Sequence, residues 1–132
     1  MTERCDILVV DDEPVVADAV RLILGDAGFA VTAVPDAETA LAHPALADCR
    51  LVLCDLMLPG LSGLDVLKVL RARRPGLPIV MTTGYATPEQ EEQVLGAGAA
   101  AFLPKPFDDT ELLTLVRRVL SQAADAREER NP

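Results

Sequence analysis

The chain has 132 residues, of which half are hydrophobic and only 3% aromatic, and it carries a formal net charge of −9. This length fits one domain with a full core of aliphatic side chains. The acidic balance argues against direct binding of nucleic acid, because such a surface repels phosphate backbones. No apolar stretch is long enough to span a membrane, and no basic start precedes a hydrophobic segment at the N-terminus. The sequence therefore predicts a cytoplasmic protein with no membrane partner.

The three cysteines, Cys5, Cys49 and Cys54, lack the C-x-x-C spacing of common zinc sites. Cys54 lies inside an apolar run, which favours a small buried thiol. The single histidine, His43, adds no metal ligand set. We therefore expect neither a zinc site nor a disulfide framework.

Short apolar runs with the character of β-strands alternate with helical patterns along the whole chain. The predicted strands are residues 7–10, 29–34, 51–54, 79–82 and 101–103. The predicted helices begin near Pro14, Asp36, Ser62, Thr87 and Asp108, and they end near Gly28, His43, Pro75, Gly98 and Leu120. Five β-α units with short connections predict an α/β fold, a doubly wound parallel sheet with helices on both faces.

Two patterns mark boundaries in the second half of the chain. Residues 87–90, Thr-Pro-Glu-Gln, predict a capping box with proline in the first helical turn. From Ser121 onward the sequence turns to Ala, Glu and Arg without an apolar stripe, so we expect the last helix to fray into a solvated tail. The predicted domain covers residues 1–122, and residues 123–132 form a polar tail or the start of a linker.

Charged residues follow three of the predicted strands at the point where each strand ends. Asp11 and Asp12 follow the first strand, Asp55 the third and Lys105 the fifth. The carboxyl ends of parallel strands share an edge, where open α/β folds bind ligands, so these side chains should converge on one pocket. Carboxylate oxygens suit a hard divalent cation such as Mg²⁺, and a lysine suits a phosphoryl oxygen.

Each carboxylate also has a simpler interpretation. Asp12 or Glu13 is suited to cap the first helix, and Asp55 is suited to bond its own backbone at the start of a loop. The two carboxylate positions together favour a cation, because a carboxylate held beside others needs charge compensation. With Mg²⁺ bound, an oxygen of Asp55 can attack phosphorus and form an aspartyl phosphate.

Two threonines and a proline-flanked lysine complete the predicted pocket. Thr82 and Thr83 end the fourth strand, and alternation places their hydroxyls on different faces. Threonine is common in strands, so both can be incidental, but Thr83 lies nearer the strand end and can bond a phosphoryl oxygen. Lys105 lies between Pro104 and Pro106, which makes the Lys105–Pro106 bond a candidate for cis geometry.

From Ile7 to about Leu120 the chain resembles the receiver domain of two-component response regulators. The resemblance rests on Asp11-Asp12, on Asp55 with the Met-Leu-Pro-Gly-Leu-Ser-Gly run of residues 57–63, on Met-Thr-Thr-Gly-Tyr at 81–85, and on Phe-Leu-Pro-Lys-Pro-Phe at 102–107. Each motif alone is weak, but together, in this order and spacing, they are highly specific. The resemblance implies a flavodoxin-like sheet of strand order 2-1-3-4-5 with five helices.

The resemblance also implies a role for each site residue. A sensor histidine kinase would donate a phosphoryl group to Asp55, Lys105 would pair with one phosphoryl oxygen, and the hydroxyl of Thr83 would bond another. The implied Mg²⁺ ligands are Asp11 or Asp12, Asp55 and the backbone carbonyl of Met57.

Signalling in this family resembles a two-state switch in which Thr83 moves toward the phosphoryl group and an aromatic residue, here Phe102, swings inward. A plain core role for Phe102 is nearly as well supported by the sequence. The output face would be residues 87–120, which would bind a downstream protein or output domain, or a second copy of the chain. The resemblance implies a phosphoacceptor that supports only its own phosphorylation and dephosphorylation, and no enzyme for outside substrates.

Two other functions remain open at this stage. A phosphorylation-independent interaction module would keep the acidic pocket and bind its partners equally well with Asp55→Asn. A metal-dependent phosphohydrolase would need an acid near the nucleophile and a cap over the substrate, but position 57 is a methionine and the loops are short. The sequence is compatible with a stand-alone receiver and with one that is followed by an output domain.

Overall fold

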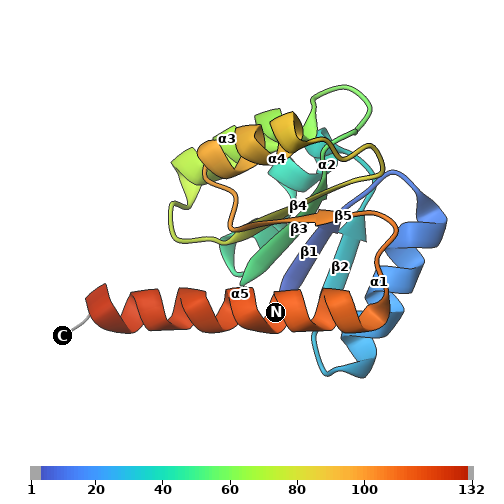
Figure 1. The fold of residues 1–132 in the computed structure, drawn as a ribbon. Coiled ribbons are helices and arrows are strands. Elements are labelled where there is room, and N and C mark those ends of the chain that lie inside the picture. Colours follow the sequence, from blue (N-terminus) through green and yellow to red (C-terminus); the bar gives the residue numbers. More distant parts are fainter. Residues whose placement is uncertain (1–3, 131–132) are drawn as a thin grey trace.

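The structure is a computed structural model that describes residues 4–130, and in this part of the chain five strands and five α-helices alternate as predicted (Figure 1). The strands are β1 (Ile7–Val10), β2 (Val31–Val34), β3 (Leu51–Asp55), β4 (Ile79–Thr83) and β5 (Ala101–Pro104). The α-helices are α1 (Pro14–Asp26), α2 (Ala37–Ala42), α3 (Gly63–Arg73), α4 (Pro88–Gly96) and α5 (Asp109–Arg130), and a short 3-10 helix, η1 (Pro44–Ala47), follows α2. None of the helices in residues 4–130 is both long and apolar enough to cross a membrane.

All five strands are parallel and form one sheet in the order β2-β1-β3-β4-β5, which confirms the predicted topology. The register of β1 places Ile7 beside Val31 on one side and beside Leu51 on the other. The chain first winds outward from β1 to β2 and then returns to β3 on the other side of β1. The crevice at this reversal lies at the carboxyl ends of β1 and β3, where such folds bind ligands.

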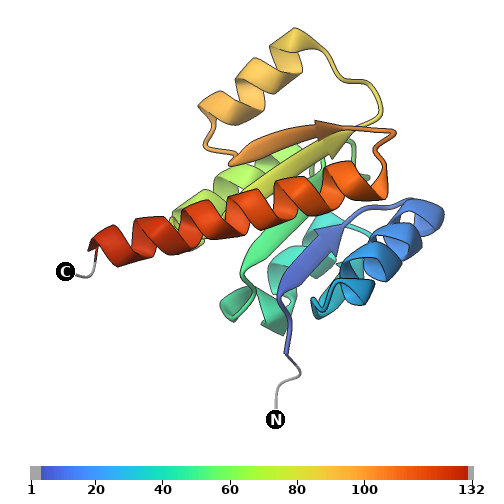
Figure 2. The ribbon, with the colours of Figure 1, turned by 60° about the horizontal axis from the view of Figure 1, so that its bottom comes forward.

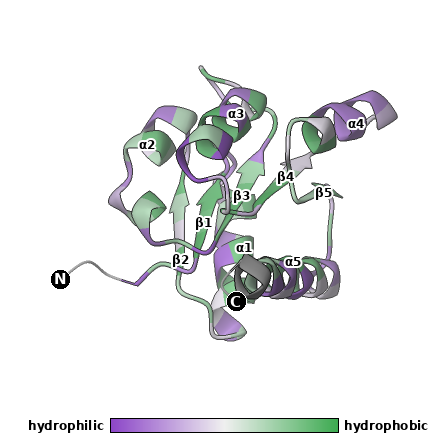
Figure 3. Ribbon diagram, turned by 90° about the vertical axis from the view of Figure 1, so that its left-hand side faces the viewer, coloured by the Kyte–Doolittle hydropathy of each residue, from purple (hydrophilic) through white to green (hydrophobic). Residues whose placement is uncertain are grey.

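Helices cover both faces of the sheet. Helices α2, α3 and α4 pack on one face, and α1 and α5 pack on the other (Figures 1 and 2). Every residue of β1, β3 and β4 is buried, as expected for central strands covered on both sides. In Figure 3 the central strands β1, β3 and β4 are coloured mainly as hydrophobic, while hydrophilic stretches gather on the helices around them. The aliphatic runs of the sequence thus form a rigid sheet that fixes the positions of the residues at its edge.

The start of α3 packs unusually tightly against the end of β3. Ser62 caps the helix: its hydroxyl accepts the N–H of Asp65 at 3.2 Å, and the Asp65 carboxylate accepts the N–H of Ser62 at 3.3 Å. The next residue, Gly63, donates its N–H to the carbonyl of Leu56 at 3.0 Å. A Cβ at Gly63 would lie 2.2 Å from the backbone oxygen of Asp55, so only glycine fits beside this strand end.

The predicted capping box of α4 is only half present. The hydroxyl of Thr87 accepts the N–H of Gln90 at 3.1 Å, and Pro88 occupies the first turn, as predicted. The side-chain oxygen of Gln90 is buried and has no hydrogen-bond partner among the described residues, so the reciprocal bond to the Thr87 N–H does not form. The reciprocal half of that prediction is wrong.

Two predicted boundaries also need correction. The second strand begins at Val31 and not at Phe29. Gly28, at a φ of 98°, and Phe29 instead close the end of α1, where the Phe29 N–H bonds the carbonyl of Leu24 at 3.1 Å.

Helix α5 does not fray at Ser121 but continues to Arg130. The residues of this extension are mostly strong helix formers, which sustain a helix without an apolar stripe. Figures 1 and 2 both show α5 extending past the sheet. The domain boundary at residue 122 stays a prediction.

Candidate functional site

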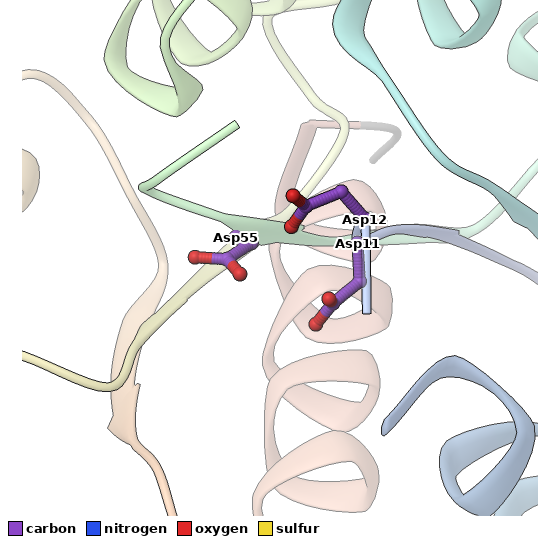
Figure 4. A group of neighbouring side chains, drawn as sticks. All are labelled: Asp11, Asp12 and Asp55. Atoms are coloured by element: carbon purple, nitrogen blue, oxygen red, sulfur yellow. The ribbon is translucent and has the colours of Figure 1, made fainter. Parts of the chain in front are cut away.

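Three aspartates meet at the carboxyl ends of β1 and β3 (Figure 4). One carboxylate oxygen from each of Asp11, Asp12 and Asp55 lies within 4.8 Å of the other two. Asp11 and Asp55 are buried, whereas Asp12 is exposed. The parallel register of β1 and β3 produces this arrangement, because Val10 pairs with Cys54 and the next residue of each strand is an aspartate. The predicted convergence of the three side chains is therefore present in the structure.

Lys105 provides the positive charge of the site. Its Nζ lies 2.8 Å from Oδ2 of Asp55, 2.9 Å from Oδ2 of Asp11 and 3.1 Å from Oε1 of Glu13. The lysine follows β5 directly, and its backbone N–H bonds the carbonyl of Thr83 at 2.8 Å. The Lys105–Pro106 peptide bond is cis, as predicted. One ammonium group thus holds side chains that are far apart in the sequence.

The side chain of Lys105 keeps its positive charge. Burial on its own would lower the pKa of this amine, but its bonds to Asp55, Asp11 and Glu13 outweigh burial and raise the pKa above its ordinary value. Lysine titrates near pH 10 even when unperturbed, so the group stays charged throughout the physiological range. The site therefore combines a permanent cation with a larger number of carboxylates.

Each buried aspartate uses its two oxygens differently. In Asp11, Oδ1 accepts the N–H of Glu13 at 2.9 Å; in Asp55, Oδ1 accepts the N–H of Met57 at 2.9 Å. In both residues the other oxygen faces Lys105. Asp55 thus bonds its own loop backbone, as its simpler interpretation predicts, and at the same time presents an oxygen to a cation. These bonds fix the orientation of both carboxylates.

The two threonines at the end of β4 are both buried, and Thr82 pairs with Asp55 in the sheet register. The hydroxyl of Thr83 accepts the N–H of Tyr85 at 3.2 Å. Tyr85 itself is 76% exposed. Thr83 is joined to Lys105 through the backbone bond described above, which places it beside the site.

For Met57 and Phe102 the structure gives the position of the residue but does not test its predicted role. Met57 donates its N–H to Asp55, and the residue as a whole is 56% exposed. Its carbonyl is the atom assigned to the cation by the resemblance. Phe102 is partly buried and packs against the core cluster between the sheet and helices α2 to α4. Both a core role and a switch role for Phe102 are compatible with this packing.

Glu13 and Gly63 are site residues that the sequence did not reveal. Glu13 occupies the N-cap position of α1, yet its side chain makes no capping bond and lies at Lys105 instead. Its position directly after the aspartate pair was the available signal. Gly63 sets the distance between α3 and the Asp55 carbonyl, and its place at the end of the 57–63 run was the available signal, although the run alone does not reveal that contact.

The chemistry of the donor set fits a small divalent cation. Three carboxylates within reach of one another supply hard oxygen ligands, which Mg²⁺ prefers in proteins. With Glu13 they outnumber the single ammonium of Lys105, so the pocket keeps an excess of negative charge that a dication would offset. The described residues therefore form an acidic pocket suited to a cation and a phosphoryl group together.

Residues 7–117 match the family described as the response regulator receiver domain, so this chain belongs to that family of two-component signalling proteins. The chain is 40% identical over 119 residues to the sensory transduction protein RegX3 of Mycolicibacterium smegmatis, covering 90% of this chain and 52% of that protein. It is 35% identical over 128 residues to the transcriptional regulatory protein FixJ of Bradyrhizobium diazoefficiens, covering 96% of this chain and 62% of that protein. The chain thus spans between half and two thirds of these relatives.

Solved structures show the same fold. A CheY-like response regulator receiver domain protein from Methanospirillum hungatei superposes with a TM-score of 0.86 at 31% identity, covering 94% of this chain and 99% of that one. The receiver domain of NtrX from Brucella abortus gives a TM-score of 0.82 at 39% identity, covering 88% of this chain and 98% of that one. Both are of the length of a single receiver domain.

Proposed function

We propose that this receiver accepts a phosphoryl group on Asp55 from a sensor histidine kinase and thereby changes the affinity of its face formed by residues 87–120 for a partner. The observation that carries the proposal is the placement of Lys105, whose Nζ lies within 3 Å of both buried carboxylates. A buried, oriented carboxylate beside a permanent cation is suited to receive a phosphoryl group, because the cation compensates the added negative charge.

The chemistry assigns one task to each side chain. Oδ2 of Asp55, which contacts Lys105 while Oδ1 accepts the Met57 N–H, forms the new bond to phosphorus as the bond between phosphorus and the donor nitrogen breaks. Lys105 exchanges its contact with that oxygen for a phosphoryl oxygen. Asp11, Asp12 and Asp55, with the carbonyl of Met57, would hold Mg²⁺, which would supply further positive charge against the phosphoryl oxygens.

The switch extends from the pocket through β4 and β5. The hydroxyl of Thr83 accepts a hydrogen bond from the Tyr85 N–H at 3.2 Å. On phosphorylation it would give up this bond and donate to a phosphoryl oxygen. Thr83 pairs with Pro104 in the sheet, and Met81 pairs with Phe102. A displacement of the end of β4 would therefore also displace β5. This coupling would move Phe102 and alter the surface of α4, β5 and α5.

The proposed partners follow from this scheme. The phosphodonor is a cytoplasmic histidine kinase, and the recipient of the signal is a downstream protein, an output domain or a second copy of the chain. The domain acts on no outside substrate and catalyses only its own phosphorylation and dephosphorylation. The competing function is an interaction module whose affinity for its partner does not depend on phosphorylation of the pocket. It predicts that Asp55→Asn and the wild type bind the partner equally well, with or without a phosphodonor.

Intact-mass analysis after incubation with acetyl phosphate and Mg²⁺ tests the proposal. We expect the mass of one phosphoryl group to be added, with no addition for Asp55→Asn or after metal chelation. Asp48→Asn is a matched control, because Asp48 is exposed, directly follows η1 and lies outside the pocket. Equal labelling of Asp55→Asn would overturn the assignment. Absence of labelling in the wild type, with acetyl phosphate and with a purified histidine kinase, would favour the interaction module.

A further inference from the structure

The carboxylate of Glu13 belongs to the acidic pocket but has no task in the proposed phosphorylation. Its Oε1 lies 3.1 Å from Nζ of Lys105 and accepts a hydrogen bond from it. The backbone N–H of the same residue donates to Oδ1 of Asp11 at 2.9 Å. Glu13 is therefore bonded to two charged groups of the pocket, through its side chain to the lysine and through its backbone to a buried aspartate.

The ammonium group of Lys105 is fully occupied in this state. It carries three N–H groups, and carboxylate oxygens of Asp55, Asp11 and Glu13 surround it at 2.8, 2.9 and 3.1 Å. The contact with Glu13 is the longest of the three. The side chain of Glu13 is also 58% exposed, against 5% for Asp11 and 4% for Asp55. The ion pair with Glu13 is therefore the one that water replaces most easily.

Glu13 contacts Lys105 instead of capping helix α1. It occupies the N-cap position with an extended backbone, yet its side chain makes no capping bond, and the first turn of α1 contains no acidic residue. Aspartate, serine and threonine are preferred at this position, because their short side chains accept an N–H of the second or third helical residue. A negative charge at a helix start is favourable as well. The start of α1 thus offers a carboxylate at position 13 a second place to bind.

We propose that Glu13 is a positioning residue that holds Lys105 in the unphosphorylated domain and releases it when Asp55 carries a phosphoryl group. This inference rests on the proposed function and concerns the regulation of the same site. A phosphoryl group adds negative charge to a pocket in which carboxylates already outnumber the ammonium. Asp11 and Asp12 are assigned to the cation, so Glu13 is the carboxylate that turns away, toward solvent or the start of α1.

The release of Lys105 makes Glu13 a brake on the switch. A contact that exists only in the unphosphorylated domain stabilises that state and opposes the change to the phosphorylated one. The loss of one exposed ion pair corresponds to a change of about two- to fivefold in an equilibrium constant. The ammonium of Lys105 is mostly buried, with 11% of the side chain exposed, so we expect the upper end of this range.

Two substitutions separate the contact from the charge. Glu13→Gln keeps the length of the side chain and removes its charge. Glu13→Asp keeps the charge, but it is one methylene shorter, so it loses the contact with Lys105 and gains the length of a favoured N-cap. We expect Glu13→Asp to raise Tm by about 2–4 °C while it also releases the switch. The control is Asp18→Asn, because Asp18 is an exposed residue of α1 whose ion-pair partner is Arg21, at 3.8 Å.

The test is a titration of each variant with beryllium fluoride, a reversible mimic of the phosphoryl group, at a Mg²⁺ concentration that saturates all of them. Hydrogen exchange of residues 87–120 reports the switch, and thermal melts establish that each variant is folded. We expect the half-saturating concentration of beryllium fluoride to fall about fivefold for Glu13→Gln and for Glu13→Asp, and to stay unchanged for Asp18→Asn.

The other outcomes separate this inference from the proposed function. A wild type that responds while both Glu13 variants match it would overturn the inference alone, and a lower Tm without a change in response would assign Glu13 a merely structural role. A fall for Glu13→Gln without one for Glu13→Asp would assign the effect to charge at a distance and would overturn the inference as well. A wild type that does not respond to beryllium fluoride would overturn the proposed function, and this inference with it.

Discussion

The contact between Gly63 and the end of β3 leads to a sharp prediction for Gly63→Ala. The new Cβ would lie 2.2 Å from the backbone oxygen of Asp55 and 2.6 Å from Cα of Leu56, whereas ordinary contacts begin near 3.4 Å. Both obstacles are backbone atoms, so the strand end and α3 must separate by about 1 Å. A misplacement of this size at a reacting group costs about 100-fold in rate. The overpacking costs about 1–3 kcal/mol in the free energy of unfolding.

Phosphorylation by acetyl phosphate, followed by intact mass over time, measures the rate. Gly76→Ala is the matched control, since a Cβ at Gly76 meets nothing within 4 Å. We expect a slow but folded Gly63→Ala variant and a control with the wild-type rate. Circular dichroism at the assay temperature separates slow chemistry from unfolding. A folded Gly63→Ala variant that is phosphorylated at the wild-type rate would refute the claim that this contact positions Asp55.

Three further variants probe the charges. Lys105→Ala should leave a domain that is labelled but does not switch, so that hydrogen exchange in residues 87–120 no longer changes on phosphorylation; a normal change would contradict the proposed role. Asp12→Ala should weaken Mg²⁺ binding about tenfold or more in a titration, and an unchanged affinity would assign that role to Asp11. At Asp6, burial would raise the pKa, but the Ala30 N–H and Arg4 outweigh it and lower the pKa. Its stabilising contribution is therefore present above about pH 4 and is lost as the pH falls through the lowered pKa. Asp6→Asn should cost about 1–2 kcal/mol at pH 7 in urea unfolding, and this deficit should shrink at acidic pH; a deficit that is independent of pH would contradict the assignment.

The main features of the fold were predictable because local and global signals agree in this chain. Buried parallel strands appear as continuous aliphatic runs, and strand ends carry their charged residues at one edge. For this reason the sequence alone predicts that Asp11, Asp55 and Lys105 meet. The resemblance to receiver domains then supplied the strand order, which periodicity alone does not determine.

The features that escaped prediction depend on contacts between elements. The link from Glu13 to Lys105 and the tight packing of Gly63 against the end of β3 arise where separate elements meet. The predicted end of α5 near Leu120 is wrong for a different reason. The loss of the apolar stripe after Ser121 removes tertiary support, but the intrinsic helix propensity of the residues that follow is sufficient to continue the helix.

The central claim is that Asp55 itself carries the phosphoryl group. Borohydride reduction after treatment with acetyl phosphate and Mg²⁺ tests it most directly, because an aspartyl phosphate is reduced to homoserine while a free aspartate is not. Peptide mapping should then find homoserine at position 55 alone, in amounts that match the intact-mass gain. Homoserine at position 11 or 12, or a phosphorylated protein with an unreduced Asp55, would contradict the account.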